Sequence, residues 1–481
     1  MMARILSCGV LAVALLSHAR AEPPIYAHKE APVASFSWLD AIQAKVPPLK
    51  HDRGNHLPMI LWQAGPFELQ QPDVYKALLA RGLTQHIHLD ERMIPIAKAL
   101  QDAGSPVIMM EGAAGQWPSS LAGDQKEWAH QFDAGYTPKS PVHACPAIAK
   151  GWAINAQKIR DILQKYKDAG VTVDAVWMDW EGDPVGGADR YEQALHCARC
   201  RGTLPPGVLA DEKSFNDYCW RRYMELTGGY LAAPVAEIFP ACSTTNWHAT
   251  VSTQARPVRK WLGDPICPVV PPFFTASNPV AYGNTVSFRL WKPEYKADRE
   301  HVDQFYTHLL LKEVSADTAN RLVWTPGRRS LPWVCRWCPD DPNPKIPIMT
   351  RERYREALRH LWLRGISDMQ IFNPLREGYE TLAINEVQDA AAIYDEMLEY
   401  RAFLDEGIPL CLNIPKPQDH GVLWSGLRLK NRAVVRIFKQ GNGKTKVTVE
   451  PWPGRKITLE ATPAGKTYLL VLKDGKIRIS E

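Results

Sequence analysis

The sequence predicts an α/β fold in which a (β/α)8 TIM barrel is followed by a small C-terminal antiparallel β domain. Up to about residue 408, short apolar runs alternate with longer amphipathic segments, many of which end at a glycine, as helices often do. From residue 409 onward, apolar and polar residues alternate between glycine-containing turns, which is typical of antiparallel strands. A doubly wound open sheet is the alternative for the first part, but such sheets seldom hold eight parallel strands in about 350 residues.

The pattern also predicts where the elements lie. The eight predicted barrel strands are the apolar runs at 59–63, 85–90, 106–111, 173–181, 235–240, 266–274, 321–325 and 368–372. Helices are predicted at 74–82, 94–104, 154–170, 301–314, 351–365 and 385–404. The resulting domains are a signal peptide at 1–21, an N-terminal lead-in at 22–54, the barrel at 55–408 and the β domain at 409–481.

Composition excludes several classes of protein. Of the 481 residues, 45% are hydrophobic and 23% are charged, as in ordinary globular proteins. A net charge of +5 is too small and too mixed to predict a nucleic-acid partner. Apart from the N-terminus, no segment approaches the ~20 apolar residues of a membrane span. The β domain alone is basic, with 14 Lys and Arg against 5 Asp and Glu, which favours a solvated face over a surface for polyanions.

The first 21 residues read as a signal peptide. Arg4 provides a positive charge, a dozen apolar residues follow, and Ala19-Arg20-Ala21 fits a cleavage site. A buried N-terminal helix is the alternative. We therefore expect an exported protein, either secreted or periplasmic.

Cleavage would leave nine cysteines, four of them in two C-x-x-C pairs. Those four, Cys197, Cys200, Cys335 and Cys338, could form a structural zinc site, although 134 residues separate the pairs. In an oxidising compartment, disulfides that use Cys145, Cys219, Cys242 or Cys267 are the favoured alternative. In either case we expect the cysteines to cross-link loops and not to take part in the reaction. No cofactor is predicted for the reaction.

The fourth apolar run carries the residues best suited to chemistry. Side chains alternate across a strand, so Val173, Ala175, Trp177, Asp179 and Glu181 share one face, which we expect to point into the barrel. The two carboxylates would stand at the carboxyl end of the strand, where barrel enzymes have their active sites. Burial and mutual repulsion are expected to raise the pKa of Glu181. A protonated carboxyl beside an ionised one is what cleavage of a glycosidic bond requires, whereas an acidic pair neutralised by arginine is the non-catalytic alternative.

Asp179-Trp180-Glu181 on a fourth barrel strand resembles the D-W-E of the chitinase-like glycoside hydrolases of family 18 and of the hyaluronidases of family 56. The resemblance implies that Glu181 is the general acid/base. It also implies that Asp179 orients the 2-acetamido group of an N-acetylhexosamine substrate, which itself attacks the anomeric carbon. Of the family 18 signature D-x-x-D-x-D-x-E, Asp174, Asp179 and Glu181 match, while Trp177 replaces the middle Asp, which hyaluronidases also lack.

Residues near other predicted strand ends fit a glycan-binding site, because flat rings with a polar edge suit the mixed faces of sugars. The candidate substrate-binding residues are Trp62, Gln63, Asp90, Glu111, Trp180, Trp247, Tyr282, Trp324 and Asn373. By the same resemblance, Tyr282 is a counterpart for the family 18 tyrosine near strand six. A single tryptophan is more often a packing residue, but several at one rim favour a platform for a sugar.

Three other functions stay open. A glycosidase with two ordinary carboxylates would take its second carboxylate from Glu111 or Asp90. A chitinase-like lectin would keep the barrel and bind sugar without cleaving it. A metal-dependent barrel hydrolase would use His86 and His88, but the sequence has no further histidine near the sixth run to complete such a site.

Overall fold

The structure is a computed structural model of the chain. It describes residues 22–34, 36–62, 72–111, 129–139, 144–178, 188–246, 274–282, 298–324, 326–337, 345–372, 376–416, 419 and 421–480. The predicted signal peptide lies outside these ranges. Among the helices described, none is both long and apolar enough to cross a membrane.

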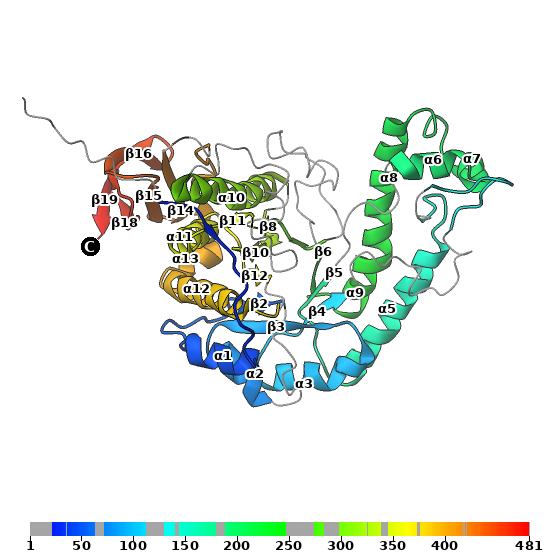
Figure 1. The fold of residues 1–481 in the computed structure, drawn as a ribbon, viewed down its shortest axis with the longest axis horizontal. Coiled ribbons are helices and arrows are strands. Elements are labelled where there is room, and N and C mark those ends of the chain that lie inside the picture. The colour runs from blue at the N-terminus through cyan, green and yellow to red at the C-terminus, as the bar shows by residue number, and fades with distance from the viewer. Residues whose placement is uncertain are drawn as a thin grey trace, which may run out of the picture.

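Eight parallel strands form the central sheet, as predicted (Figure 1). They are β2 (Met59–Leu61), β3 (Leu83–His88), β4 (Ile108–Glu111), β5 (Ala175–Met178), β6 (Ser243–Asn246), β8 (Val280–Tyr282), β10 (Trp333–Cys335) and β12 (Gln370–Ile371). Their order in the sheet is β6-β5-β4-β3-β2-β12-β10-β8, so β6 and β8 are its two end members. The Thr275 N–H donates to the Thr244 carbonyl at 2.9 Å, which joins the chain entering β8 to β6. The chain therefore forms a TIM barrel.

Most of the helices cover the outside of the barrel, and the others form a lobe at its side (Figure 1). They are α1 (Trp38–Lys45), α2 (Pro72–Leu79), α3 (Ile94–Asp102), α5 (Lys150–Asp168), α6 (Ala188–Leu195), α7 (Ala198–Thr203), α8 (Glu212–Thr227), α9 (Ala233–Ile238), α10 (Arg299–Trp324), α11 (Arg351–Trp362), α12 (Glu380–Leu398) and α13 (Arg401–Glu406). Their apolar faces and the outward faces of the strands share one large core. Helices α5 to α8 extend away from the barrel as a lobe at the right of Figure 1.

Two of the predicted strands are wrong. The run 235–240 belongs mainly to α9, which begins beside Pro234 and packs on α5. The run 321–325 falls at the end of α10, which continues to Trp324. The run 266–274 lies outside the described residues except for Phe274. The fifth, sixth and seventh strands of the barrel in chain order are instead β6, β8 and β10. A search for apolar runs misses β6, because its sequence Ser-Thr-Thr-Asn is polar.

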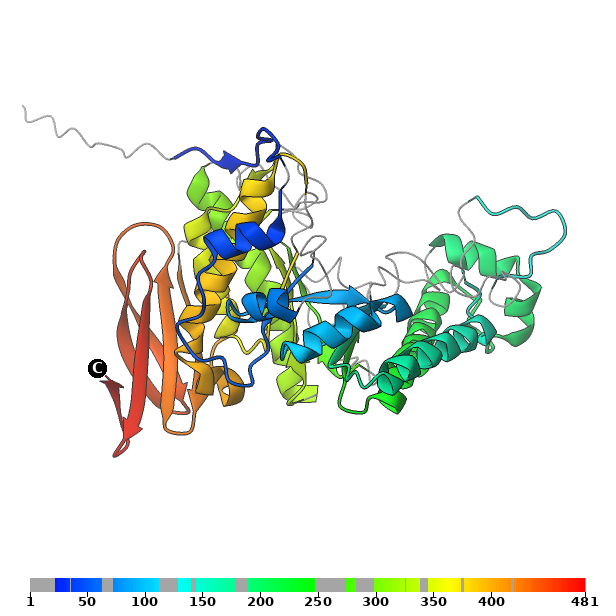
Figure 2. The same ribbon diagram turned by 90° about the horizontal axis from the view of Figure 1, so that it is seen from below.

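The C-terminal segment folds as antiparallel strands, as predicted. A five-stranded sheet contains β13 (Ile408–Pro409), β14 (Val422–Leu429), β15 (Arg432–Lys439), β18 (Lys466–Lys473) and β19 (Lys476–Ser480), and a hairpin contains β16 (Thr445–Trp452) and β17 (Arg455–Ala461). The sheet and hairpin enclose a core of their own. Figure 2 shows this β domain against the barrel helices, at the end opposite the α5–α8 lobe.

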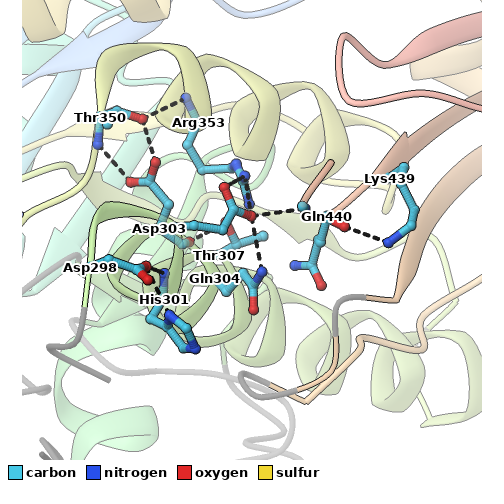
Figure 3. A network of polar contacts seen from close by, with 11 residues as sticks. Asp298, His301, Asp303, Gln304, Thr307, Thr350, Arg353, Lys439 and Gln440 are labelled. Carbon is cyan, nitrogen blue, oxygen red and sulfur yellow. Dashed lines mark hydrogen bonds and ion pairs between the residues drawn. The ribbon is translucent and has the colours of Figure 1, made fainter. Parts of the chain in front are cut away.

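A polar network ties the β domain to the first turns of α10 and α11 (Figure 3). Thr350 caps α11 and binds Asp303 through its backbone N–H at 2.8 Å and its hydroxyl at 2.6 Å. Arg353 donates to both oxygens of Glu300, and the N–H of Gly441, just after β15, donates to the same carboxylate at 3.0 Å. The β domain is thus fastened to the wall of the barrel.

Candidate functional site

Aromatic side chains from five barrel strands meet inside the barrel. Trp177 lies on β5 and Trp333 on β10, Tyr282 ends β8, and Trp62 and Phe372 directly follow β2 and β12. They form one interior cluster with smaller side chains, separate from the core between the sheet and the helices. Because successive residues of a strand point to opposite faces, each strand contributes alternate residues to this cluster.

The predicted alternation on the fourth strand is confirmed. Ala175 and Trp177 face the interior cluster, whereas Val176 and Met178 pack in the outer core. Val173, which we expected on the inner face, packs in the outer core instead, because regular strand geometry begins only at Ala175.

Three tryptophans form a triangle in this interior. The ring centroids lie 5.0 Å apart for Trp177 and Trp333, 5.4 Å for Trp62 and Trp177, and 5.3 Å for Trp62 and Trp333. Trp62 is partly exposed. The other two are buried, and their indole N–H groups have no hydrogen-bond partner in the part of the chain that the structure describes. Of the three rings, Trp62 is therefore the one that a ligand could reach.

Tyr282 and Phe372 form a second aromatic pair. Their rings stack with centroids 4.9 Å apart and an interplanar angle of 22°. Tyr282 is the last residue of the sixth barrel strand in chain order. The structure therefore brings it to the interior cluster, where a tyrosine could face a ligand at the barrel mouth.

His86 and His88 lie on β3, but they do not form a metal site with a third ligand among the described residues. His86 packs between Trp62 and Trp177, with centroids at 5.3 and 5.5 Å. Burial, reinforced by the nearby His88, lowers the pKa of His86 to about 3. His86 is therefore a neutral ring that packs with the tryptophans.

Of the candidate carboxylates Asp90, Glu111, Asp179 and Glu181, only Asp90 has a side chain that the structure describes. Asp90 caps the 3-10 turn Glu91–Met93, and both of its oxygens accept hydrogen bonds from the Arg92 side chain, which lowers its pKa to about 2. Glu111 is the last residue of β4, and its side chain lies outside the described set. Asp179 and Glu181 also lie outside the described residues. They follow Met178, the last residue of β5, directly in the chain.

The other predicted sugar-binding residues divide into two groups. Gln63, Trp180, Trp247 and Asn373 lie outside the described residues. We expected Trp324 on a barrel strand, but it is the last residue of α10. The error arises because the apolar run around it completes a 26-residue helix.

Sequence reasoning missed Trp333 and Phe372 as parts of this interior. Trp333 opens a strand of three residues, too short for alternation to be recognised. The signal that could have found it is the apolar run from Leu331 to Cys335, followed by an amphipathic helix that begins at Arg351.

The cysteines combine differently from the prediction. Cys335 lies in the barrel interior with Trp333, and Cys338 is outside the described residues. In place of that pair, Cys145 and His130 join Cys197 and Cys200 in one buried group. The seven described cysteines are all free thiols, so the expected disulfides are not formed among them. The error in the zinc prediction arises because spacing along the chain says nothing about which distant loops meet.

The sequence matches no family model and no curated protein. Several solved structures are similar in chain trace. Isomaltulose synthase from Klebsiella sp. LX3 matches 88% of this chain and 99% of its own at 9% identity and a TM-score of 0.46. A family 30 endoxylanase from Clostridium papyrosolvens C71 matches 88% and 97% at 8% identity and a TM-score of 0.41. An α-L-fucosidase from Paenibacillus thiaminolyticus matches 81% of this chain at 12% identity and a TM-score of 0.42, and this chain spans half of its length.

Proposed function

We propose that the protein is an exported glycoside hydrolase that acts on a glycan containing N-acetylhexosamine. The observation that carries the proposal is the position of β5. It is the fourth strand of the barrel in chain order and ends at Met178, so Asp179-Trp180-Glu181 continues the chain from the carboxyl end of that strand. Active sites of barrel enzymes lie at this end.

The interior cluster supports a sugar as the ligand. Trp62 is partly exposed and supplies an apolar ring surface, and the buried Trp177 and Trp333 pack against it. Sugars present apolar C–H faces and polar hydroxyl edges, which such rings can match. Tyr282 adds a hydroxyl at the end of the sixth strand.

In the proposed reaction, Glu181 donates a proton to the glycosidic oxygen while the acetamido oxygen of the substrate attacks the anomeric carbon. The bond between the anomeric carbon and the leaving sugar breaks. The acetamido oxygen is now bonded to the anomeric carbon, which closes a new ring on the substrate. Glu181, now ionised, takes a proton from a water molecule that reopens the ring, which restores the acid form. Asp179 orients the acetamido group, and Tyr282 donates a hydrogen bond to its oxygen.

The test is release of reducing ends by the mature protein from hyaluronan, chondroitin, chitin oligomers and glycans without acetamido groups. We expect activity on acetamido substrates only, and its loss in Glu181→Gln. The matched control is Glu399→Gln, because Glu399 is exposed at the C-terminal end of α12. Full activity in Glu181→Gln would refute the assignment.

The same panel separates the alternatives. Cleavage of glycans without acetamido groups would keep the glycosidase and discard the substrate-assisted mechanism in favour of two carboxylates. Saturable binding of an oligosaccharide without turnover would indicate a lectin. Among the described residues nothing favours the metal-dependent alternative, because His86 and His88 have no third metal ligand near them there.

A further inference from the structure

A buried group of three cysteines and one histidine lies in the α5–α8 lobe, apart from the barrel interior. His130, Cys145, Cys197 and Cys200 are all buried, and each offers a ligand atom within 4.8 Å of the other three. The Sγ atoms of Cys145 and Cys200 are 3.4 Å apart, and Cys200 Sγ lies 3.6 Å from His130 Nδ1.

These distances fit a tetrahedral metal site. Zinc bonds of about 2.3 Å to sulfur and about 2.0 Å to nitrogen put two sulfurs roughly 3.8 Å apart and a sulfur and a nitrogen roughly 3.6 Å apart. The separation of Cys200 and His130 agrees with that value, and the two sulfurs need to move by only a few tenths of an ångström.

The backbone positions the sulfur atoms in advance. Cys197 precedes α7, and its Sγ accepts N–H groups from Cys200 at 3.4 Å and from Gln131 at 3.2 Å. The Ala198 N–H also donates to the Gln131 carbonyl at 2.8 Å. Hydrogen bonds of this kind to metal-binding thiolates orient the ligands and stabilise their negative charge.

Further contacts hold the two loops together. Arg201 donates to both oxygens of Asp133, at 2.6 and 2.8 Å, and Arg199 donates to the carbonyl of Ala129 at 2.7 Å. The loop that bears His130 is therefore fixed to the turn that bears Cys197 and Cys200 even before a metal is considered.

A disulfide explains the group less well. It would consume two of the three sulfurs and leave the third, together with the buried His130, without a role. Four protein ligands with no open position are typical of a structural zinc site, since catalytic zinc keeps one position for water.

We propose that His130, Cys145, Cys197 and Cys200 bind one zinc ion that clamps two barrel connections together. His130 and Cys145 belong to the connection from β4 to α5, and Cys197 and Cys200 belong to the connection from β5 to β6. The clamp thus links the segments that leave the third and fourth barrel strands at their carboxyl ends. This proposal does not depend on the proposed glycosidase activity.

The test is the metal content of the purified mature protein by mass spectrometry, together with a non-reducing peptide map. We expect about one zinc per chain and reduced Cys145, Cys197 and Cys200. We expect Cys197→Ser and His130→Ala to lose the zinc. Cys242→Ser should keep it, because Cys242 is a buried free cysteine outside the group.

A second measurement covers variants that fail to fold. Wild-type protein refolded with Co²⁺ in place of zinc should show the visible bands of tetrahedral cobalt and a thiolate-to-cobalt charge-transfer band, and a chelator should lower its Tm. Wild-type protein without zinc, with two of the three cysteines in a disulfide, would overturn the proposal. Cobalt spectra without a thiolate band would overturn it as well.

Discussion

Arg436 of β15 and Glu356 of α11 form a double hydrogen bond across the boundary between the β domain and the barrel. The Arg436 Nε donates to one carboxylate oxygen at 2.9 Å and its second nitrogen donates to the other at 2.6 Å. Both side chains are almost completely buried, and His360 Nε2 lies 3.2 Å from the same carboxylate. Burial alone would raise the pKa of Glu356, but contacts with His360 and Arg436 lower it to about 2. The pair therefore holds an ionised carboxylate inside the domain boundary.

Removing the arginine should be costly. Arg436→Met leaves Glu356 buried with a poorer set of partners, and breaking a buried ion pair from one side costs about 3–5 kcal/mol. Urea unfolding of wild type and variant measures the difference. The control is Arg455→Met, because Arg455 is exposed on β17 and should change the free energy of unfolding by less than about 0.5 kcal/mol. Equal effects of the two changes would show that the pair does not couple the domains.

The stability of the protein should depend on pH through Glu386 between about pH 5 and pH 8. Glu386 is fully buried on α12, and burial raises its pKa to about 8 from an ordinary value of 4.5. Since the folded state favours the protonated form, its contribution is complete below pH 4.5 and is lost as the pH rises towards 8. Relative to Glu386→Gln, wild type should therefore lose free energy of unfolding between pH 5 and pH 8.5, measured in urea. A constant difference across that range would contradict the assignment.

Tyr282 should affect turnover more than folding. If its hydroxyl donates to the acetamido oxygen as the reaction develops charge, Tyr282→Phe should lower kcat by about 10²-fold with little change in KM. Steady-state kinetics on an acetamido substrate measures this, and the Tm shows whether the fold survives. Tyr191→Phe is the control, because the Tyr191 hydroxyl donates to the carbonyl of Leu209 away from the barrel interior. A change in KM alone would assign Tyr282 to ground-state binding.

Gly82 should tolerate no side chain. Its φ is +72°, and a Cβ there would lie 2.7 Å from the ring of Tyr394. Gly104 has a similar φ of +76° but open space around its Cβ position. Gly104→Ala should therefore cost only the backbone strain of about 1–2 kcal/mol, and Gly82→Ala should cost roughly 1–3 kcal/mol more from overpacking. Urea unfolding of both variants tests the difference, and equal costs would mean that Tyr394 moves aside freely.

Local periodicity was enough to predict much of the barrel. The strands that contain Met59–Leu61 and Ala175–Met178 and the helix Arg351–Trp362 follow from runs of apolar residues, because burial on one face leaves a repeating pattern in contiguous residues. The same reasoning failed at β6, where buried threonines lie in a polar-looking strand, and at the end of α10, where an apolar run continues a helix.

By itself, the sequence determined the fold class, the change to antiparallel strands after residue 409 and the place of Asp179 and Glu181 after the fourth strand, because each depends on neighbours in the chain. Only the tertiary structure decided that Trp62, Trp177 and Trp333 share one interior and that Cys145 and His130 join Cys197 and Cys200. Such contacts join residues tens to hundreds of positions apart. Their partners are selected by how strands curl and loops close in space, which the pattern of a linear chain does not record.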